Sequence, residues 1–233
     1  MTSFQYDMRI TKDYPSLAAG VIVAQGMSNA QSPDTLRNLY LDEQTAVKAR
    51  IGTTPLSELP TLIAWRRAIS AFGVSPTKYR SAAESLLRRL TKKGDIPCIN
   101  TLVDIGNLVS IRYGLPVAIF DTGQIAAPIT VHYSDGGEDF IDLGSDKIVH
   151  PAAGEVIFSD EARMVVARRW CWRQSATSAS NASTTDAVIT IEAHHDGGSD
   201  DIENALADLL ALFAEYAGGS YDSALLDADN PAI

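Results

Sequence analysis

The sequence has little of what marks secreted and membrane proteins. Two cysteines among 233 residues are too few for a disulfide framework. There is no run of 18 apolar residues, so we expect no transmembrane helix. Residues 1–25 have no basic segment followed by an apolar core, which argues against a signal peptide. With 45% hydrophobic and 21% charged residues, we expect a cytoplasmic protein that folds without disulfides or metal.

Motifs for common enzyme chemistry are also missing. There is no glycine-rich phosphate loop, no cysteine-pair zinc motif and no serine nucleophile motif. His194, His195 and Asp196 are adjacent, but neighbouring strand residues point to opposite faces, which disfavours a shared metal ion. Cys98 and Cys171 lack a histidine close in sequence and are interpreted as packed thiols. The sequence therefore predicts no metal and no cofactor.

Positive charge is scarce and unevenly distributed. The net charge of −10 comes from 29 acidic and 19 basic residues, which disfavours a uniformly basic nucleic-acid-binding surface. Residues 66–93 nevertheless contain eight basic residues and one acidic residue, whereas residues 174–233 contain 11 acidic residues and no basic one. The candidate RNA-binding residues in the basic segment are Arg66, Arg67, Lys78, Arg80, Arg88, Arg89, Lys92 and Lys93. The alternative is a solvated face that pairs with the acidic C-terminal stretch.

Hydrophobic periodicity is mainly helical in the first half of the chain and alternating in the second. Helices are expected at residues 34–50, 62–72, 81–90, 100–113 and 199–217. Strands are expected at residues 17–24, 116–121, 125–133, 154–159, 163–173 and 187–193. This order predicts an α+β fold, with N-terminal helices packed on a mixed or antiparallel sheet built mainly from the C-terminal half, and a final C-terminal helix. Residues 1–217 are predicted to form one domain, followed by a flexible acidic tail at 218–233.

The predicted helix at 100–113 carries a polar stripe. Asn100, Asp104 and Asn107 lie within about 60° of one another around its axis. The helix is apolar on nearly every other side, which indicates burial. These three side chains must then form hydrogen bonds with other parts of the protein.

The segment 163–173 combines arginine with tryptophan. In a continuous strand, Trp170 and Trp172 would share one face, and Arg173 would lie on the other. Arginine beside tryptophan suits cation–π packing or base stacking. The favoured interpretation is two core tryptophans with arginine at the rim of the sheet.

Several segments occur in an order that is typical of one family. The segments are residues 75–90, 97–110, 115–121, 154–160, 168–175 and 184–193. The most specific are Asn-x-x-Val-Asp-x-x-Asn, which starts at Asn100, and the pair Phe120-Asp121. Together they resemble the editing module of the phenylalanyl-tRNA synthetase beta subunit, the tRNA synthetase B3/B4 domain, in its free-standing form. The resemblance covers roughly residues 37–195 and implies an α+β fold.

The resemblance also implies a function. In that family the module hydrolyses tyrosine wrongly attached to the phenylalanine tRNA, and it selects the error by its hydroxyl group. Ester cleavage there needs a positioned water and donors to the oxyanion, so no catalytic side chain is assigned. Asn100, Asp104 and Asn107 match the buried polar helix of the family. Glu192 matches the glutamate that recognises the tyrosine hydroxyl, and these four residues form the implied substrate pocket.

The sequence departs from the family at two points. The family has a histidine where this chain has Ala118. It also has a glycine-rich turn where this chain has residues 170–173, Trp-Cys-Trp-Arg. Arg173 joins the candidate pocket because a guanidinium can bind a carboxylate or a phosphate.

Three functional interpretations remain open. The first is an aminoacyl-tRNA deacylase that binds tRNA or aminoacyl-tRNA through the basic residues, without a synthetase alpha subunit or a membrane as partner. The second is a non-catalytic module that binds RNA or a small ligand, which the missing histidine favours. The third is that the basic segment docks the acidic tail and no nucleic acid is involved.

Overall fold

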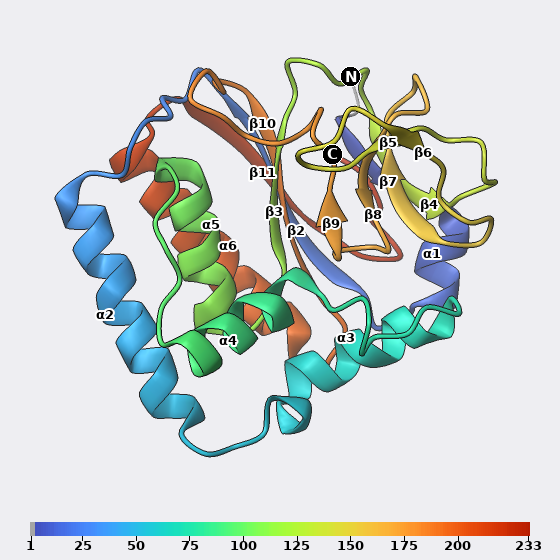
Figure 1. The fold of residues 1–233 in the computed structure, drawn as a ribbon. Coiled ribbons are helices and arrows are strands. Elements are labelled where there is room, and N and C mark those ends of the chain that lie inside the picture. The colour runs from blue at the N-terminus through green and yellow to red at the C-terminus, as the bar shows by residue number, and fades with distance from the viewer. Residues whose placement is uncertain (1–2) are drawn as a thin grey trace.

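The computed structural model describes residues 3–233 as a mixed α+β protein (Figure 1). Its helices are α1 Met8–Asp13, α2 Asp34–Ile51, the short 3-10 helix η1 Leu56–Glu58, α3 Pro60–Ala71, α4 Ala82–Lys93, α5 Thr101–Tyr113 and α6 Gly198–Tyr216. Its strands are β1 Phe4–Tyr6, β2 Ala18–Gln25, β3 Val117–Asp121, β4 Ile129–Tyr133, β5 Phe140–Ile141, β6 Ile148–Val149, β7 Val156–Ser159, β8 Val165–Arg168, β9 Arg173–Gln174, β10 Ala187–Ala193 and β11 Ser220–Leu226. The predicted α+β class is confirmed.

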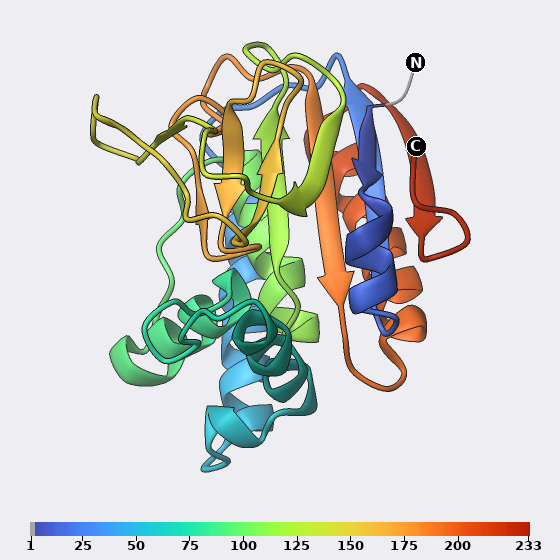
Figure 2. The ribbon, with the colours of Figure 1, turned by 90° about the vertical axis from the view of Figure 1, so that its right-hand side faces the viewer.

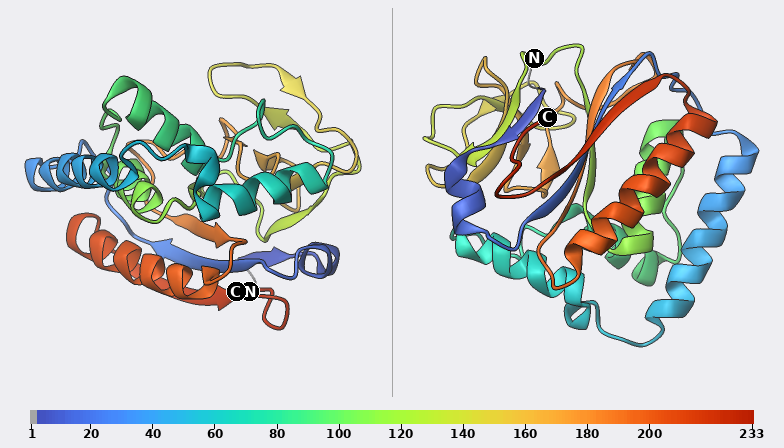
Figure 3. Two further views of the ribbon diagram at one scale, coloured as in Figure 1. Left: turned by 90° about the horizontal axis from the view of Figure 1, so that it is seen from below. Right: turned by 180° about the vertical axis from the view of Figure 1, so that it is seen from behind.

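Two large sheets pack face to face. The central sheet has the antiparallel order β11-β2-β10-β3, and the second sheet has the order β1-β4-β7-β8-β9, in which only β1 and β4 pair in parallel. Helices α5 and α6 cover the other face of the central sheet, and α2 packs outside α5 (Figure 1). Helix α3 lies across one end of both sheets (Figure 3). The β5–β6 hairpin projects away from the rest of the molecule (Figure 2).

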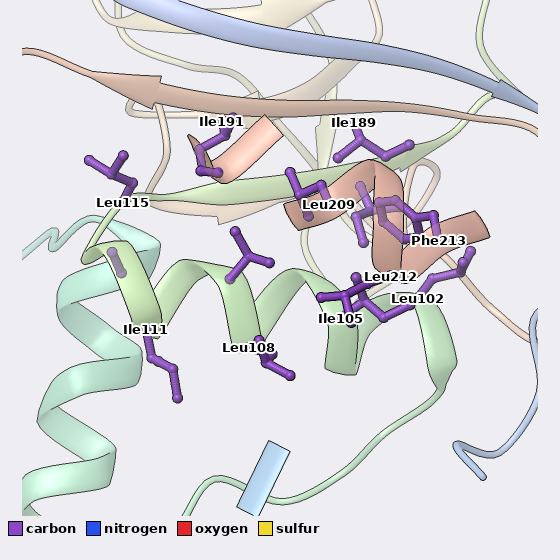
Figure 4. Close-up of a cluster of buried hydrophobic side chains, with 14 of the residues drawn as sticks. Leu102, Ile105, Leu108, Ile111, Leu115, Ile189, Ile191, Leu209, Leu212 and Phe213 are labelled. Atoms are coloured by element: carbon purple, nitrogen blue, oxygen red, sulfur yellow. The ribbon is translucent and has the colours of Figure 1, made fainter. Parts of the chain in front are cut away.

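The residues of β10 alternate between two cores. Ile189 and Ile191 are fully buried among side chains of α5 and α6, including Leu108 and Phe213 (Figure 4). Val188, on the opposite face, packs in the core between the two sheets. This period of two is the pattern expected of a strand buried on both faces.

Local sequence signals explain the ends of α4 and α5. Ser81 and Asn100 accept hydrogen bonds from the backbone N–H groups of Glu84 and Val103, and so cap the two helices. Gly94 and Gly114 end them in the left-handed conformation, which costs little without a Cβ atom. The start of α4 and both ends of α5 agree within one residue with those predicted from the sequence, but α4 ends at Lys93, three residues later than predicted.

The C-terminal residues differ from the flexible tail predicted at 218–233. Residues 220–226 form β11, which pairs with β2 along the edge of the central sheet. Farther on, the backbone N–H of Ile233 donates to the carbonyl of Phe4 at 3.0 Å, and Phe4 donates back at 3.1 Å. Backbone hydrogen bonds therefore order this acidic segment, although most β11 side chains are exposed and give a weak sequence signal.

Further elements differ from the sequence prediction. The single strand predicted at 163–173 is interrupted, because Arg169 and Trp170 adopt left-handed φ angles of 48° and 59°. Strand β1 and helix α1 were not predicted. Across residues 3–233, no helix is both long and apolar enough to cross a membrane.

Candidate functional site

A cavity of about 150 Å³ lies between the two sheets, where β3 and β10 face β7, β8 and the turn before β9. Helix α5 reaches it around β3, which is the edge strand of the central sheet. A water molecule needs only about 10–15 Å³ of such space, so a small organic group fits. Val103, Phe120, Phe158 and Trp170 supply much of the apolar wall. An apolar cavity with few polar groups is typical of a ligand site.

Glu192 is a buried ionisable group of this cavity that is held by hydrogen bonds from several aromatic side chains. It lies on β10, is 2% exposed and lines the cavity. Its Oε1 atom accepts hydrogen bonds from the Tyr6 hydroxyl at 2.6 Å and from Trp170 Nε1 at 2.9 Å. Trp65 Nε1 donates to the Glu192 backbone carbonyl at 3.3 Å. These contacts fix the position of the carboxyl group.

The second oxygen of Glu192, Oε2, accepts no hydrogen bond from any residue between 3 and 233. Burial raises the pKa of Glu192 to about 7, although the hydrogen bonds from Trp170 and Tyr6 act in the opposite direction. The carboxyl group therefore exchanges between its protonated and ionised forms near neutral pH. A hydroxyl group is both donor and acceptor, so it suits either form.

The turn after β8 places Trp170 in the core and Trp172 at the cavity wall. Trp170 is fully buried and packs edge-to-face on Tyr14 and Trp65, at ring distances of 4.7 and 5.5 Å. Trp172 is half-buried. The two rings do not share a face, and this corrects the interpretation of both as core residues. Only Trp170 belongs to the core.

Glu155 stabilises this turn. Its carboxylate binds the Arg168 guanidinium through two hydrogen bonds of 2.9 Å and accepts a third, of 3.0 Å, from the backbone N–H of Arg169. A left-handed residue other than glycine costs on the order of 1–3 kcal/mol. Such strain concentrates at functional sites, and here the buried ion pair holds it next to the cavity.

Few other polar groups face the cavity. Thr190 and Asn107 line it, and the Thr190 hydroxyl forms no hydrogen bond with the described residues. Ala118 lies beside Thr190 in the strand pairing, where a histidine would face the same space. Burial and the charge of Glu192 raise the pKa of Cys171 well above its usual value, so its thiol is neutral and a poor nucleophile.

The structure brings three of the five predicted pocket residues to the cavity. Asn107, Arg173 and Glu192 line it, with Arg173 bound to Asp142 through hydrogen bonds of 2.8 and 2.9 Å. Asn100 and Asp104 have local roles instead. The first caps α5, and the second accepts hydrogen bonds from the Ser32 hydroxyl and the Ile99 backbone, which fixes the segment before the helix.

Comparison with known proteins places this geometry in a family. Residues 64–218 match the sequence model of a protein family described as the B3/4 domain. The chain belongs to the B3/4 domain family. The match contains every residue that lines the cavity, but it excludes Tyr6. The family resemblance expected from the sequence is confirmed.

One curated relative and one solved structure that align with this chain carry synthetase names. A stretch of 76 residues is 36% identical to the phenylalanine–tRNA ligase beta subunit of Aromatoleum aromaticum, and covers 33% of this chain and 9% of that subunit. An N-terminal fragment of the phenylalanyl-tRNA synthetase beta subunit from Pyrococcus horikoshii aligns over 94% of this chain and 50% of that one, at 12% identity and a TM-score of 0.48. The B3/4 protein therefore spans a small part of the curated relative that it matches.

The predicted RNA-binding residues of this B3/4 protein lie on α3, on α4 and in the loop between them. Glu84 binds Arg66 and Arg80, and Arg89 contacts Asp95 at 3.7 Å. The other five form no ion pair with residues 3–233, and they are Arg67, Lys78, Arg88, Lys92 and Lys93. In the described part of the chain, no ion pair joins the basic segment to residues 218–233, so docking of the tail there has no contact to support it.

Tyr6, which was not among the predicted site residues, binds Glu192 from 186 positions away. The buried aromatics Phe4 and Tyr6 alternate with Gln5, and this short period of two was the available signal. His132, which no sequence motif marked, has its Nε2 atom 2.7 Å from the Ser159 hydroxyl. Neither residue lines the cavity, but Tyr6 positions the carboxyl group of Glu192, whereas His132 is assigned no role there.

The histidine pair after β10 does not form a metal site. His195 Nε2 lies 2.9 Å from Asp201. His194 is buried among aromatic rings, neither of its ring nitrogens has a hydrogen-bond partner among residues 3–233, and burial lowers its pKa to about 3. Within the described chain, no group of three or more His, Cys, Asp or Glu side chains is arranged to hold a metal ion.

Proposed function

We propose that this B3/4 protein binds aminoacyl-tRNA and hydrolyses the ester of a mischarged amino acid. The observation that carries the proposal is the buried Glu192, with Oε1 fixed by two donors and Oε2 free at an apolar cavity. The family match and the tRNA ligase name of the curated relative support the choice of substrate class.

The cavity chemistry indicates the kind of side chain that is selected. Phe120, Phe158 and Val103 suit an apolar body, and Glu192 Oε2 suits a hydroxyl at its end. A side chain without the hydroxyl would leave the buried carboxyl oxygen without a partner, which costs about 1–3 kcal/mol. Discrimination between two amino acids that differ by one hydroxyl follows from this difference.

The hydrolytic step uses water rather than a protein nucleophile. Water adds to the ester carbonyl carbon, the bond from that carbon to the ribose oxygen breaks, and the proton lost by water ends on the ribose oxygen. The products are a free amino acid and a tRNA with a free hydroxyl. We assign Glu192 to binding and orienting the side chain of the amino acid. We assign the Thr190 hydroxyl and the Asn107 amide to hydrogen bonds with the polar groups around the ester.

The exposed part of the basic segment is the proposed tRNA contact. Arg67, Lys92 and Lys93 are exposed and form no ion pair within residues 3–233. Each phosphate that such a side chain neutralises adds to the salt dependence of binding.

The test is a deacylation assay. The purified chain is mixed with tRNAs that carry radiolabelled tyrosine, phenylalanine or other amino acids, and the release of amino acid is compared with the uncatalysed rate. We expect release of a hydroxyl-bearing amino acid. Glu192→Gln is expected to change the ratio between the release rate of this amino acid and that of phenylalanine by about 10-fold, since one hydrogen bond contributes on that order. Glu203→Gln, on the exposed face of α6, is the matched control. Release at the background rate across the whole panel contradicts the proposal.

A second candidate is binding without hydrolysis, which Ala118 favours because no histidine lies at that point of the cavity. Ala118→His separates the two candidates. Under the binding-only candidate, the wild-type chain retains mischarged tRNA without turnover, and the substitution introduces release. Under the first candidate, release is already present in the wild-type protein.

A further inference from the structure

Five side chains form a cluster of cations and aromatic rings beside the cavity. The Arg169 guanidinium lies 3.7 Å from the Tyr79 ring centre and 4.5 Å from that of Trp172. The two rings meet edge-to-face at 5.0 Å. Arg173 lies 4.7 Å from the Trp172 ring centre, and the Lys78 ammonium lies 5.0 Å from that of Tyr79. We refer to Lys78, Tyr79, Arg169, Trp172 and Arg173 as the aromatic–cation cluster.

The cluster has more positive charge than its carboxylate neighbours neutralise. The Arg169 guanidinium donates no hydrogen bond to residues 3–233, and its carboxylate contact, Glu155 at 3.8 Å, is already bound to Arg168. Lys78 is exposed and forms no ion pair with the described residues. The Lys78 ammonium is therefore open to an anion, and the Arg169 side chain, which is 16% exposed, keeps N–H donors that no described residue binds.

The ion pair between Arg173 and Asp142 does not close the cluster. The two side chains are 43% and 35% exposed. An ion pair this open to solvent stabilises a protein by about 0–1 kcal/mol, so a ligand phosphate can replace the carboxylate at little cost.

The cluster connects the cavity with the basic segment. Trp172 and Arg173 belong both to the cluster and to the cavity wall. The neighbouring Cys171 carbonyl accepts a hydrogen bond of 2.9 Å from the backbone N–H of Ala82, the first residue of α4. Helix α4 then carries Arg88, Lys92 and Lys93 away from the cavity. A ligand that extends out of the cavity therefore meets the cluster before it reaches the basic residues of α4.

We propose that the aromatic–cation cluster binds the single-stranded end of an RNA whose terminal group occupies the cavity, an inference that rests on the proposed function. Bases stack on the aromatic rings and on the flat guanidinium planes, and Arg169 and Lys78 bind phosphates. A base inside a duplex is already stacked on both sides, so the cluster selects single-stranded RNA. A purely acidic partner would gain nothing from the rings.

The test is binding of a fluorescently labelled single-stranded RNA tetranucleotide, measured by anisotropy over a range of salt concentrations. Four unlabelled competitors are compared for their ability to displace it: the same tetranucleotide, an RNA duplex, inorganic tripolyphosphate and an acidic peptide. Trp172→Ala should weaken tetranucleotide binding about 5- to 150-fold, the range for one stacked base, with an unchanged salt dependence. Arg169→Ala should lower the slope of log affinity against log salt by about 0.7, the value for one phosphate contact on a single strand.

Matched variants keep the result interpretable. Arg169→Lys keeps the charge but loses the planar group, so it should weaken binding while it preserves the salt slope. Arg9→Lys is its control, because Arg9 lies over the Tyr133 ring at 5.8 Å, on a part of the surface that does not line the cavity. Circular dichroism and thermal unfolding check that each variant is folded, and Trp172→Phe replaces Trp172→Ala if the latter is not.

The outcomes separate this inference from the proposed function, because the measurement is affinity and not hydrolysis. Wild-type affinity in both Trp172→Ala and Arg169→Lys overturns the inference, as does equal competition by the tetranucleotide, the duplex, the peptide and tripolyphosphate. Selective tetranucleotide binding that depends on Trp172 supports the inference even if no amino acid is released from any tRNA.

Discussion

The two faces of β10 differ in what they bury. Toward the helices, Ile189 and Ile191 pack in a core that is almost entirely apolar (Figure 4). Toward the second sheet, Thr190 and Glu192 are equally buried, yet they meet a cavity, and Oε2 of the carboxyl has no donor among residues 3–233. Alternate residues of one strand therefore serve packing on one face and a polar site on the other.

This difference indicates which face of β10 stabilises the folded protein less. A buried polar group without a full set of partners costs free energy that an apolar residue would not. The helix face has no such groups on β10, so it can stabilise the strand that carries them on the other face. Substitutions on the two faces should therefore separate stability from ligand binding.

The largest expected effect is on the helix face. Ile191→Ala should lower the free energy of unfolding by about 2–5 kcal/mol, because it leaves a cavity among fully buried side chains. Urea unfolding measures the loss. Hydrolysis per folded molecule should stay at the wild-type rate, and a large fall in that rate at full folding would show that the two faces are not independent.

On the cavity face, we expect the ionisation of Glu192 to change the free energy of unfolding by about 3 kcal/mol with pH. The pKa of Glu192 is raised from about 4.5 to about 7 by burial, so between these values the unfolded chain has lost a proton that the folded protein retains. Ionisation in this window favours the unfolded state, and stability falls as pH rises from 4.5 to 7 and is level above.

Glu192→Gln removes this dependence. The difference in unfolding free energy between the wild type and this variant should change by about 3 kcal/mol between pH 4.5 and 7. Chemical denaturation at a series of pH values measures it, with Glu203→Gln as control. Parallel curves for wild type and Glu192→Gln would mean that the carboxyl is not desolvated in solution.

The smallest expected effect is at Thr190, whose hydroxyl lines the cavity. Thr190→Val keeps the shape and should change stability by less than about 1 kcal/mol. It should weaken binding of an adenosine that carries tyrosine in amide linkage at its 3′ position about 2- to 10-fold, the equivalent of one hydrogen bond. Calorimetric titration measures the affinity, and the exposed Thr185→Val should bind as the wild type does.

Local signals accounted for most of the helices. Ser81, Asn100, Gly94 and Gly114 mark the ends of α4 and α5, and each acts through backbone geometry and a hydrogen bond a few residues away. Such interactions depend on neighbouring residues only, so the sequence alone predicts the start of α4 and both ends of α5, although α4 runs three residues beyond its predicted end. The same is true of the alternating pattern in β10.

The site depended on contacts that no local pattern contains. Arg169 and Trp170 adopt a conformation that bulky residues rarely take, and Glu155, 14 positions from Arg169, holds them in it. The contact between Tyr6 and Glu192 spans most of the chain. Periodicity predicts which face a residue occupies, but it gives no partner, and so Tyr6 was absent from the predicted pocket.

The backbone pairing between Ile233 and Phe4 has a consequence for the order of folding. The segment at 231–233 lies against β1, and β1 carries Tyr6 to Glu192. The first contact joins the two ends of the described chain and the second spans 186 positions, and contacts between such distant residues form slowly. The cavity is therefore expected to mature last, after the helical layer has already assembled on the central sheet.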